Sequence, residues 1–175
     1  MRTLVLLRHA KSSWSIPGAD DFERPLNERG RFSAPQMGLW LSKTGINPDH
    51  VLCSPAIRTV ETYERLKASL GNQATFERVE DLYLAGTTTI LNACKTIPSD
   101  TQTVMVIGHN PGLHETALKL LTTEERSASG ALRAKFPTAA CAVIGLAIDT
   151  WADLTWDIGQ LKAYMEPRSL VAINH

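Results

Sequence analysis

Four side chains suited to phosphoryl chemistry lie near the ends of apolar stretches of this sequence: Arg8, His9, Arg58 and His109. A neutral imidazole can act as a nucleophile, and the planar guanidinium of arginine can bind two oxygens of one phosphoryl group. A single histidine after an apolar stretch is more often a structural group. The prediction of a site therefore depends on the fold bringing the four side chains together.

Three apolar stretches precede these side chains and are predicted to be buried strands of a mainly parallel sheet: Thr3–Leu7, His50–Cys53 and Thr103–Ile107. Open α/β sheets bind ligands at the carboxyl ends of their strands. Ser54 and Asn110 follow two of the stretches as predicted helix N-caps. Helix N-termini add positive potential, so the pattern predicts a compact cationic pocket at one sheet edge.

The rest of the chain predicts alternating helices and strands, preceded by a long polar loop over Lys11–Leu26. Asp21 and Arg24 in this loop form either a solvated ion pair or part of the pocket wall. Pro35 predicts a kink or a late start in the first helix. The chain as a whole predicts a three-layer α/β/α sandwich with a mainly parallel sheet and a late antiparallel hairpin. The further predicted helices are Asn27–Ser42, one bearing Arg58, Thr87–Thr96 and Leu113–Leu121, and the further predicted strands are Ala74–Val79, Ala139–Ile148 and Ala152–Lys162.

Composition and length predict one globular domain over residues 1–175. The 18 basic and 18 acidic residues give no net charge that would attract nucleic acid or a membrane surface. Cys53, Cys94 and Cys141 have no paired spacing, which argues against a disulfide framework or a zinc site. With no signal-peptide core in the first residues, we expect a cytoplasmic protein with reduced thiols.

The chain contains four segments of interest: Arg8-His9-Ala10 with Ser12 and Trp14 just after it, Asp21–Leu26, Ser54–Thr59 and Gly108–Gly112. In this order along the chain they resemble the histidine phosphatase superfamily, and in particular its short SixA-type branch of phosphohistidine phosphatases. Ala10 stands where most members of the superfamily have glycine. The resemblance covers residues 1 to about 120 and implies the fold of the phosphoglycerate mutases, which belong to the same superfamily.

The resemblance implies a catalytic set of Arg8, His9, Arg58 and His109, with Ser12 among the substrate-binding residues. His9 would attack phosphorus and form a covalent phosphohistidine that water hydrolyses. Arg8 and Arg58 would bind the phosphoryl oxygens, and His109 would donate a hydrogen bond to one of them. This chemistry requires neither a metal ion nor another cofactor.

The general acid of the wider superfamily has no clear counterpart, because Leu84 occupies the expected position. Glu80 and Asp81 lie nearby and are either weak candidates or surface charges. An acid matters most for an alcohol leaving group, whereas imidazole can be protonated by solvent. The sequence therefore favours a phosphoramidate over a sugar phosphate as the substrate, and the resemblance implies phosphohistidine on a phosphorelay or phosphocarrier protein. The alternatives are a phosphatase of small phosphoesters, less plausibly a mutase, and a phosphate-binding module without turnover.

Overall fold

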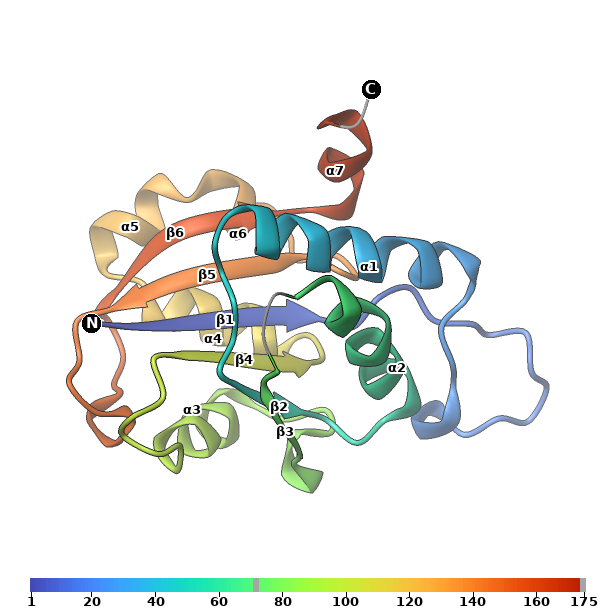
Figure 1. Ribbon diagram of the computed structural model, residues 1–175, viewed down its shortest axis with the longest axis horizontal. Helices are drawn as coiled ribbons and strands as arrows, with labels where there is room; N and C mark the ends of the chain where they lie inside the picture. The colour runs from blue at the N-terminus through green and yellow to red at the C-terminus, as the bar shows by residue number, and fades with distance from the viewer. Residues whose placement is uncertain (71–72, 174–175) are drawn as a thin grey trace.

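The computed structural model describes residues 1–70 and 73–173, within which six strands form one sheet (Figure 1). The strand order is β3-β2-β4-β1-β5-β6. The first four strands of the chain run parallel, whereas β5 runs antiparallel to both of its neighbours, β1 and β6. This confirms the predicted sheet. The strands are β1 (Arg2–Arg8), β2 (His50–Cys53), β3 (Thr75–Arg78), β4 (Thr103–Gly108), β5 (Cys141–Leu146) and β6 (Gly159–Met165).

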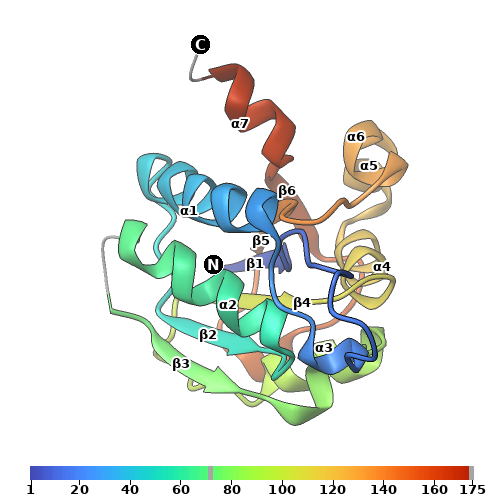
Figure 2. The same ribbon diagram turned by 90° about the vertical axis from the view of Figure 1, so that its right-hand side faces the viewer.

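Helices cover both faces of the sheet, as the side-chain alternation of β1 requires (Figure 2). Val5 and Leu7 pack in the core beneath α1, α2 and α7, whereas Leu4 and Leu6 pack in the core beneath α3 and α4. The structure is thus the predicted three-layer sandwich. The helices are α1 (Glu28–Lys43), α2 (Ile57–Leu66), α3 (Thr87–Lys95), α4 (Gly112–Leu120), α5 (Thr123–Ala128), α6 (Gly130–Ala134) and α7 (Pro167–Ile173).

Helix α1 begins where the sequence predicts, because the Asn27 side chain accepts a hydrogen bond from the Gly30 N–H at 3.0 Å. The late start considered for Pro35 is not observed, since the helix continues through that residue. Met37 and Leu41 are fully buried on its inner face. The N-cap and this buried face offset the hydrogen bond that proline cannot donate.

The last third of the chain departs from the prediction in its boundaries. The predicted strand Ala152–Lys162 is wrong at its start, because Trp151–Asp153 forms a 3₁₀ turn and β6 begins only at Gly159. Trp151 is fully buried, and its indole N–H donates to the Thr101 carbonyl at 2.9 Å. Burial of this large side chain therefore holds the turn between β5 and β6, and the second strand of the predicted hairpin starts later than the sequence indicated. The short helices α5, α6 and α7 were not predicted.

The cysteines Cys53, Cys94 and Cys141 are all free and buried, as the sequence predicted. Burial raises the pKa of Cys53 and of Cys94 to about 12, and raises that of Cys141 as well. Such thiols remain protonated and unreactive at neutral pH. No helix within the described residues has the length and apolar character needed to cross a membrane.

Candidate active site

The four predicted side chains meet at the carboxyl ends of β1, β2 and β4, at the sheet edge that faces the viewer in Figure 2. Strand register brings them together, because Arg8 pairs with Gly108 across β1 and β4, one residue before His9 and His109. Arg58 lies in the first turn of α2. We refer to Arg8, His9, Arg58 and His109 as the basic site.

His9 is buried and held in one orientation. Its Nδ1 lies 2.7 Å from the Ala10 carbonyl oxygen, which can only accept, so Nδ1 carries the proton and Nε2 keeps a lone pair. Burial, with smaller contributions from His109, Arg58 and Arg8, lowers the pKa of His9 to about 3. The imidazole is therefore neutral at physiological pH, as a nitrogen nucleophile must be.

The methyl group of Ala10 occupies an apolar pocket of its own beside His9. The side chain is fully buried in a small cluster with Leu26, Ala34 and Ala139. The Ala10 N–H donates to the Thr62 hydroxyl of α2 at 3.0 Å. This bond ties the segment that carries His9 to the helix that carries Arg58.

His109 lies across the site, with its ring centroid 5.4 Å from that of His9. Its Nδ1 accepts from Nη2 of Arg58 at 3.3 Å, and its Nε2 lies 2.7 Å from the Ser54 hydroxyl. Burial, followed by the charge of Arg58, lowers the pKa of His109 to about 3. Ser54 thus orients a histidine. The predicted N-cap role of Ser54 is wrong, since α2 begins three residues later and has no side-chain cap.

Arg8 is anchored through the loop that precedes β5. Its Nη1 donates to the Phe136 carbonyl at 3.0 Å, and the Asn110 amide donates to the same oxygen at 2.8 Å. The predicted N-cap role of Asn110 is therefore also wrong, because its side chain turns away from α4 to this carbonyl. Burial and the nearby Arg58 lower the pKa of Arg8 from its usual value.

Asp21 joins the site from the long loop after β1. Its carboxylate accepts from Arg58 at 3.0 Å, from Arg24 at 3.0 Å and from the Tyr83 hydroxyl at 2.5 Å. The hydrogen bond from Tyr83, assisted by Arg24 and Arg58, holds the pKa of Asp21 well below its usual range. We call Asp21, Arg24 and Tyr83 the Asp21 cluster. The sequence left two interpretations of the Asp21–Arg24 pair, a solvated ion pair or part of the pocket wall. The structure supports a role in the pocket wall.

The remaining predicted residues lie less centrally. Ser12 is buried, but its hydroxyl accepts from Arg24 at 2.5 Å, so it reaches the basic site only through the Asp21 cluster. Glu80 and Asp81 are exposed on a 3₁₀ turn and form no hydrogen bond or ion pair with the basic site. Leu84, at the position expected for an acid, is exposed with a φ of +50°.

The loop that carries Tyr83 is held close to the basic site by the start of α4. A Cβ atom at Gly112 would overlap the Ala85 carbonyl oxygen, so glycine permits this approach. Tyr83 then stands edge-on to His109, with centroids 5.5 Å apart. Sequence reasoning missed Tyr83 because an isolated tyrosine after a strand has no motif. The available signal was its position beside the expected acid.

No group of three or more His, Cys, Asp or Glu side chains in residues 1–70 and 73–173 is arranged to hold a metal ion. What the site offers is a set of fixed donors around a neutral imidazole. Such an arrangement can bind a tetrahedral oxyanion and present a nitrogen lone pair to its centre.

Comparison with known proteins agrees with this geometry. Residues 4–83 match the model of the histidine phosphatase superfamily, branch 1. An uncharacterized protein of Mycobacterium tuberculosis is 34% identical over 164 residues, which cover 93% of this chain and 100% of the relative. A candidate phosphohistidine phosphatase SixA from Nakamurella multipartitia is 33% identical, with a TM-score of 0.81 over 95% of this chain and 96% of that one.

A second structure, the protein histidine phosphatase SixA complexed with tungstate, shares the fold. Its TM-score is 0.77 at 22% identity, over 96% of this chain and 99% of that one. The chain belongs to the histidine phosphatase superfamily, in the SixA-type branch of that class.

Proposed function

We propose that this protein is a phosphatase that removes the phosphoryl group from phosphohistidine on another protein, through a covalent intermediate on His9. The observation that carries the proposal is the orientation of His9. Its Nδ1 proton is committed to the Ala10 carbonyl at 2.7 Å, and the neutral ring leaves Nε2 as the attacking atom.

The proposed reaction has two steps, transfer of the phosphoryl group to His9 and hydrolysis of the phosphohistidine. The Nε2 lone pair of His9 attacks phosphorus as the bond from phosphorus to the substrate imidazole breaks, and the departing imidazole takes a proton from water. Water then attacks the phosphoryl group on His9 as the bond from phosphorus to Nε2 breaks, and it returns to the solvent the proton taken in the first step, which releases inorganic phosphate and restores the neutral ring. Each step passes through a transition state whose charge lies on three equatorial oxygens.

Donors for those oxygens surround His9. The Nε atoms of Arg8 and Arg58 are buried and have no hydrogen-bond partner in the structure, which is costly for a charged donor unless an acceptor reaches it. His109 can contribute when Nη2 of Arg58 turns from Nδ1 to a phosphoryl oxygen and the ring tautomer reverses, with the Ser54 hydroxyl donating to Nε2 and Nδ1–H donating to the substrate. The same serine supports either tautomer because a hydroxyl both donates and accepts.

The choice of substrate follows from which groups near the basic site can donate a proton to the leaving group. Asp21 is the carboxylate bonded to the basic site, yet its lowered pKa keeps it ionised, so it cannot protonate a leaving group. Glu80 and Asp81 are exposed and form no hydrogen bond or ion pair with the basic site. An imidazole leaving group tolerates this lack of an acid, whereas an alkoxide does not. The names of the SixA relatives support the same substrate class.

The experiment is a trapping assay with a protein labelled on phosphohistidine. Acid-labile, base-stable label should accumulate on the wild-type protein during turnover, and His9→Ala should abolish it. His50→Ala is the matched control, because His50 lies at the opposite end of β2. Label on another residue, or turnover without trapped label, would exclude the proposed nucleophile. Faster hydrolysis of small phosphoesters than of phosphohistidine would favour the alternative substrate class.

A further inference from the structure

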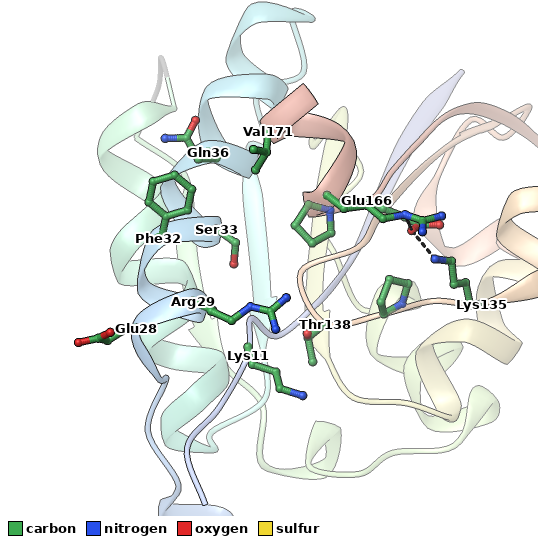
Figure 3. A pocket seen from close by; sticks show the side chains of 13 residues that line it. Lys11, Glu28, Arg29, Phe32, Ser33, Gln36, Lys135, Thr138, Glu166 and Val171 are labelled. Atoms are coloured by element: carbon green, nitrogen blue, oxygen red, sulfur yellow. Dashed lines mark ion pairs between the residues drawn. The ribbon is translucent and has the colours of Figure 1, made fainter. Parts of the chain in front are cut away.

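A groove of about 460 Å³ lies between α1, α7 and the loop that joins α6 to β5 (Figure 3). Phe32 and Gln36 of α1 line one side, and Val171 of α7 lines the other. Pro137 and Thr138 of the intervening loop complete it. None of the four residues of the basic site lines this space, so it is distinct from the pocket around His9. We call it the α1–α7 groove.

The groove nevertheless adjoins the basic site through shared backbone. Lys11 lines the groove two residues after His9. Pro137 follows Phe136, whose carbonyl accepts from Arg8, and Thr138 precedes Ala139, whose N–H donates to the His9 carbonyl at 3.0 Å. A molecule seated in the groove therefore contacts the same backbone segments that hold the nucleophile.

Two large apolar side chains are exposed on the walls. Phe32 is 60% exposed and Val171 is 46% exposed, and they approach the groove from opposite helices (Figure 3). Exposed aromatic and branched side chains around a hollow are typical of interaction surfaces, because covering them removes apolar area from water.

The rim of the groove is positively charged. Its ionisable lining residues are Lys11, Arg29, Lys135 and Arg168 against Glu28 and Glu166. The Glu166 side chain is only 7% exposed and is paired with Lys135 at 2.8 Å and with Arg168 at 2.9 Å. No carboxylate of the described residues forms an ion pair with Lys11 or Arg29. A chain with no net charge thus concentrates basic groups around an apolar strip.

We propose that the α1–α7 groove docks an acidic segment of the phosphorylated protein substrate, with an apolar side chain of that segment seated between Phe32 and Val171. The inference rests on the proposed function and adds to it the surface by which a protein substrate is selected. Docking beside Lys11 holds the substrate protein against the segment that carries His9. Charge complementarity with Lys11 and Arg29 favours carboxylates around the apolar contact.

The test compares two substrates with the same reacting bond: free phosphohistidine and an acidic protein phosphorylated on histidine. Phe32→Asp and Arg29→Glu alter the groove. Leu39→Asp and Lys43→Glu are matched changes at exposed positions of the same helix outside it. The groove variants should lower kcat/KM for the protein about tenfold or more, mainly through KM, as expected for central interface contacts. They should leave the rate on free phosphohistidine unchanged.

The controls should behave like wild type on both substrates. Equal losses on both substrates would overturn docking, because they would indicate structural damage, and so would unchanged KM for the protein in both groove variants. Wild-type protein that hydrolyses neither phosphohistidine substrate but cleaves p-nitrophenyl phosphate would overturn the proposed function and the docking inference with it. The first two results leave the proposed function intact, so the two failures are distinguishable.

Discussion

Replacement of Arg58 by lysine would test the geometry of the basic site most directly. Two terminal nitrogens of Arg58 make three contacts: Nη1 donates to the Asp21 carbonyl at 2.5 Å, and Nη2 donates to the Asp21 carboxylate at 3.0 Å and to His109 Nδ1 at 3.3 Å. The side chain is 3% exposed. Lysine keeps the charge but offers one nitrogen, so it cannot reproduce this planar fork or the buried Nε donor.

The magnitude follows from the donors lost. A hydrogen bond to a charged group contributes about 1.5–3 kcal/mol, and loss of one preorganised donor to a transition-state oxyanion lowers kcat about 10²–10³-fold. We therefore expect Arg58→Lys to reduce kcat on phosphohistidine protein at least about 10²-fold. The charge that faces Asp21 is retained, so the circular dichroism spectrum should stay close to wild type, whereas the lost hydrogen bonds should lower the unfolding temperature.

Arg65→Lys on the same helix is the matched control for steady-state kinetics. The Arg65 side chain is 43% exposed and forms a 3.4 Å ion pair with Glu61, a type of surface contact that contributes less than about 1 kcal/mol. Its kcat should therefore be unchanged. A near-normal kcat for Arg58→Lys, or equal losses in both variants, would refute the assignment of Arg58 to the phosphoryl oxygens.

Three further predictions concern other groups of the site. Asp21→Asn should lower kcat about tenfold or more, because Arg58 is no longer held in place by the carboxylate. Inhibition by vanadate should not weaken, because the carboxylate that is removed repels this anion. Parallel losses of kcat and of vanadate inhibition would contradict an orienting role. The pKa values of His9 and His109, about 3 in the folded protein against 6.5 normally, mean that the unfolded chain binds more protons. The free energy of unfolding should therefore be highest above pH 6.5 and should fall as the pH is lowered toward 3. Urea unfolding should show a loss on the order of 2 kcal/mol per histidine between pH 7 and pH 5. A free energy of unfolding that does not change with pH would show that the rings are not kept neutral. Vanadate and tungstate should inhibit by imitating the phosphoryl group, and a chelator should leave activity unchanged; activity that vanished on chelation and returned with a divalent ion would contradict the metal-free mechanism.

The basic site was predictable because its residues follow strands in sequence. Apolar stretches such as Thr3–Leu7 specify buried parallel strands on their own, and parallel strands end at a common edge. Arg8, His9 and His109 are fixed by that rule alone. The sequence therefore contains, in local form, most of the information that places these three side chains together.

The surrounding support was not predictable, because it depends on contacts between distant segments. Ser54 and Asn110 have the chemistry of helix caps, yet each bonds instead to a group more than 20 residues away, His109 and the Phe136 carbonyl. Asp21 meets Tyr83 across 62 positions of the chain. Such contacts depend on the path of loops, which local propensity does not encode.

The burial of all three thiols makes this chain a favourable host for a single reporter group. Cys53, Cys94 and Cys141 are inaccessible, and their protonated sulfurs do not compete for a maleimide at neutral pH. Glu28→Cys, at an exposed position on the rim of the α1–α7 groove that makes none of the proposed docking contacts, would thus give one reactive thiol that takes a fluorophore, with no need to remove native cysteines. The emission of that dye would follow the arrival and departure of a protein substrate in real time, separately from the chemical step at His9.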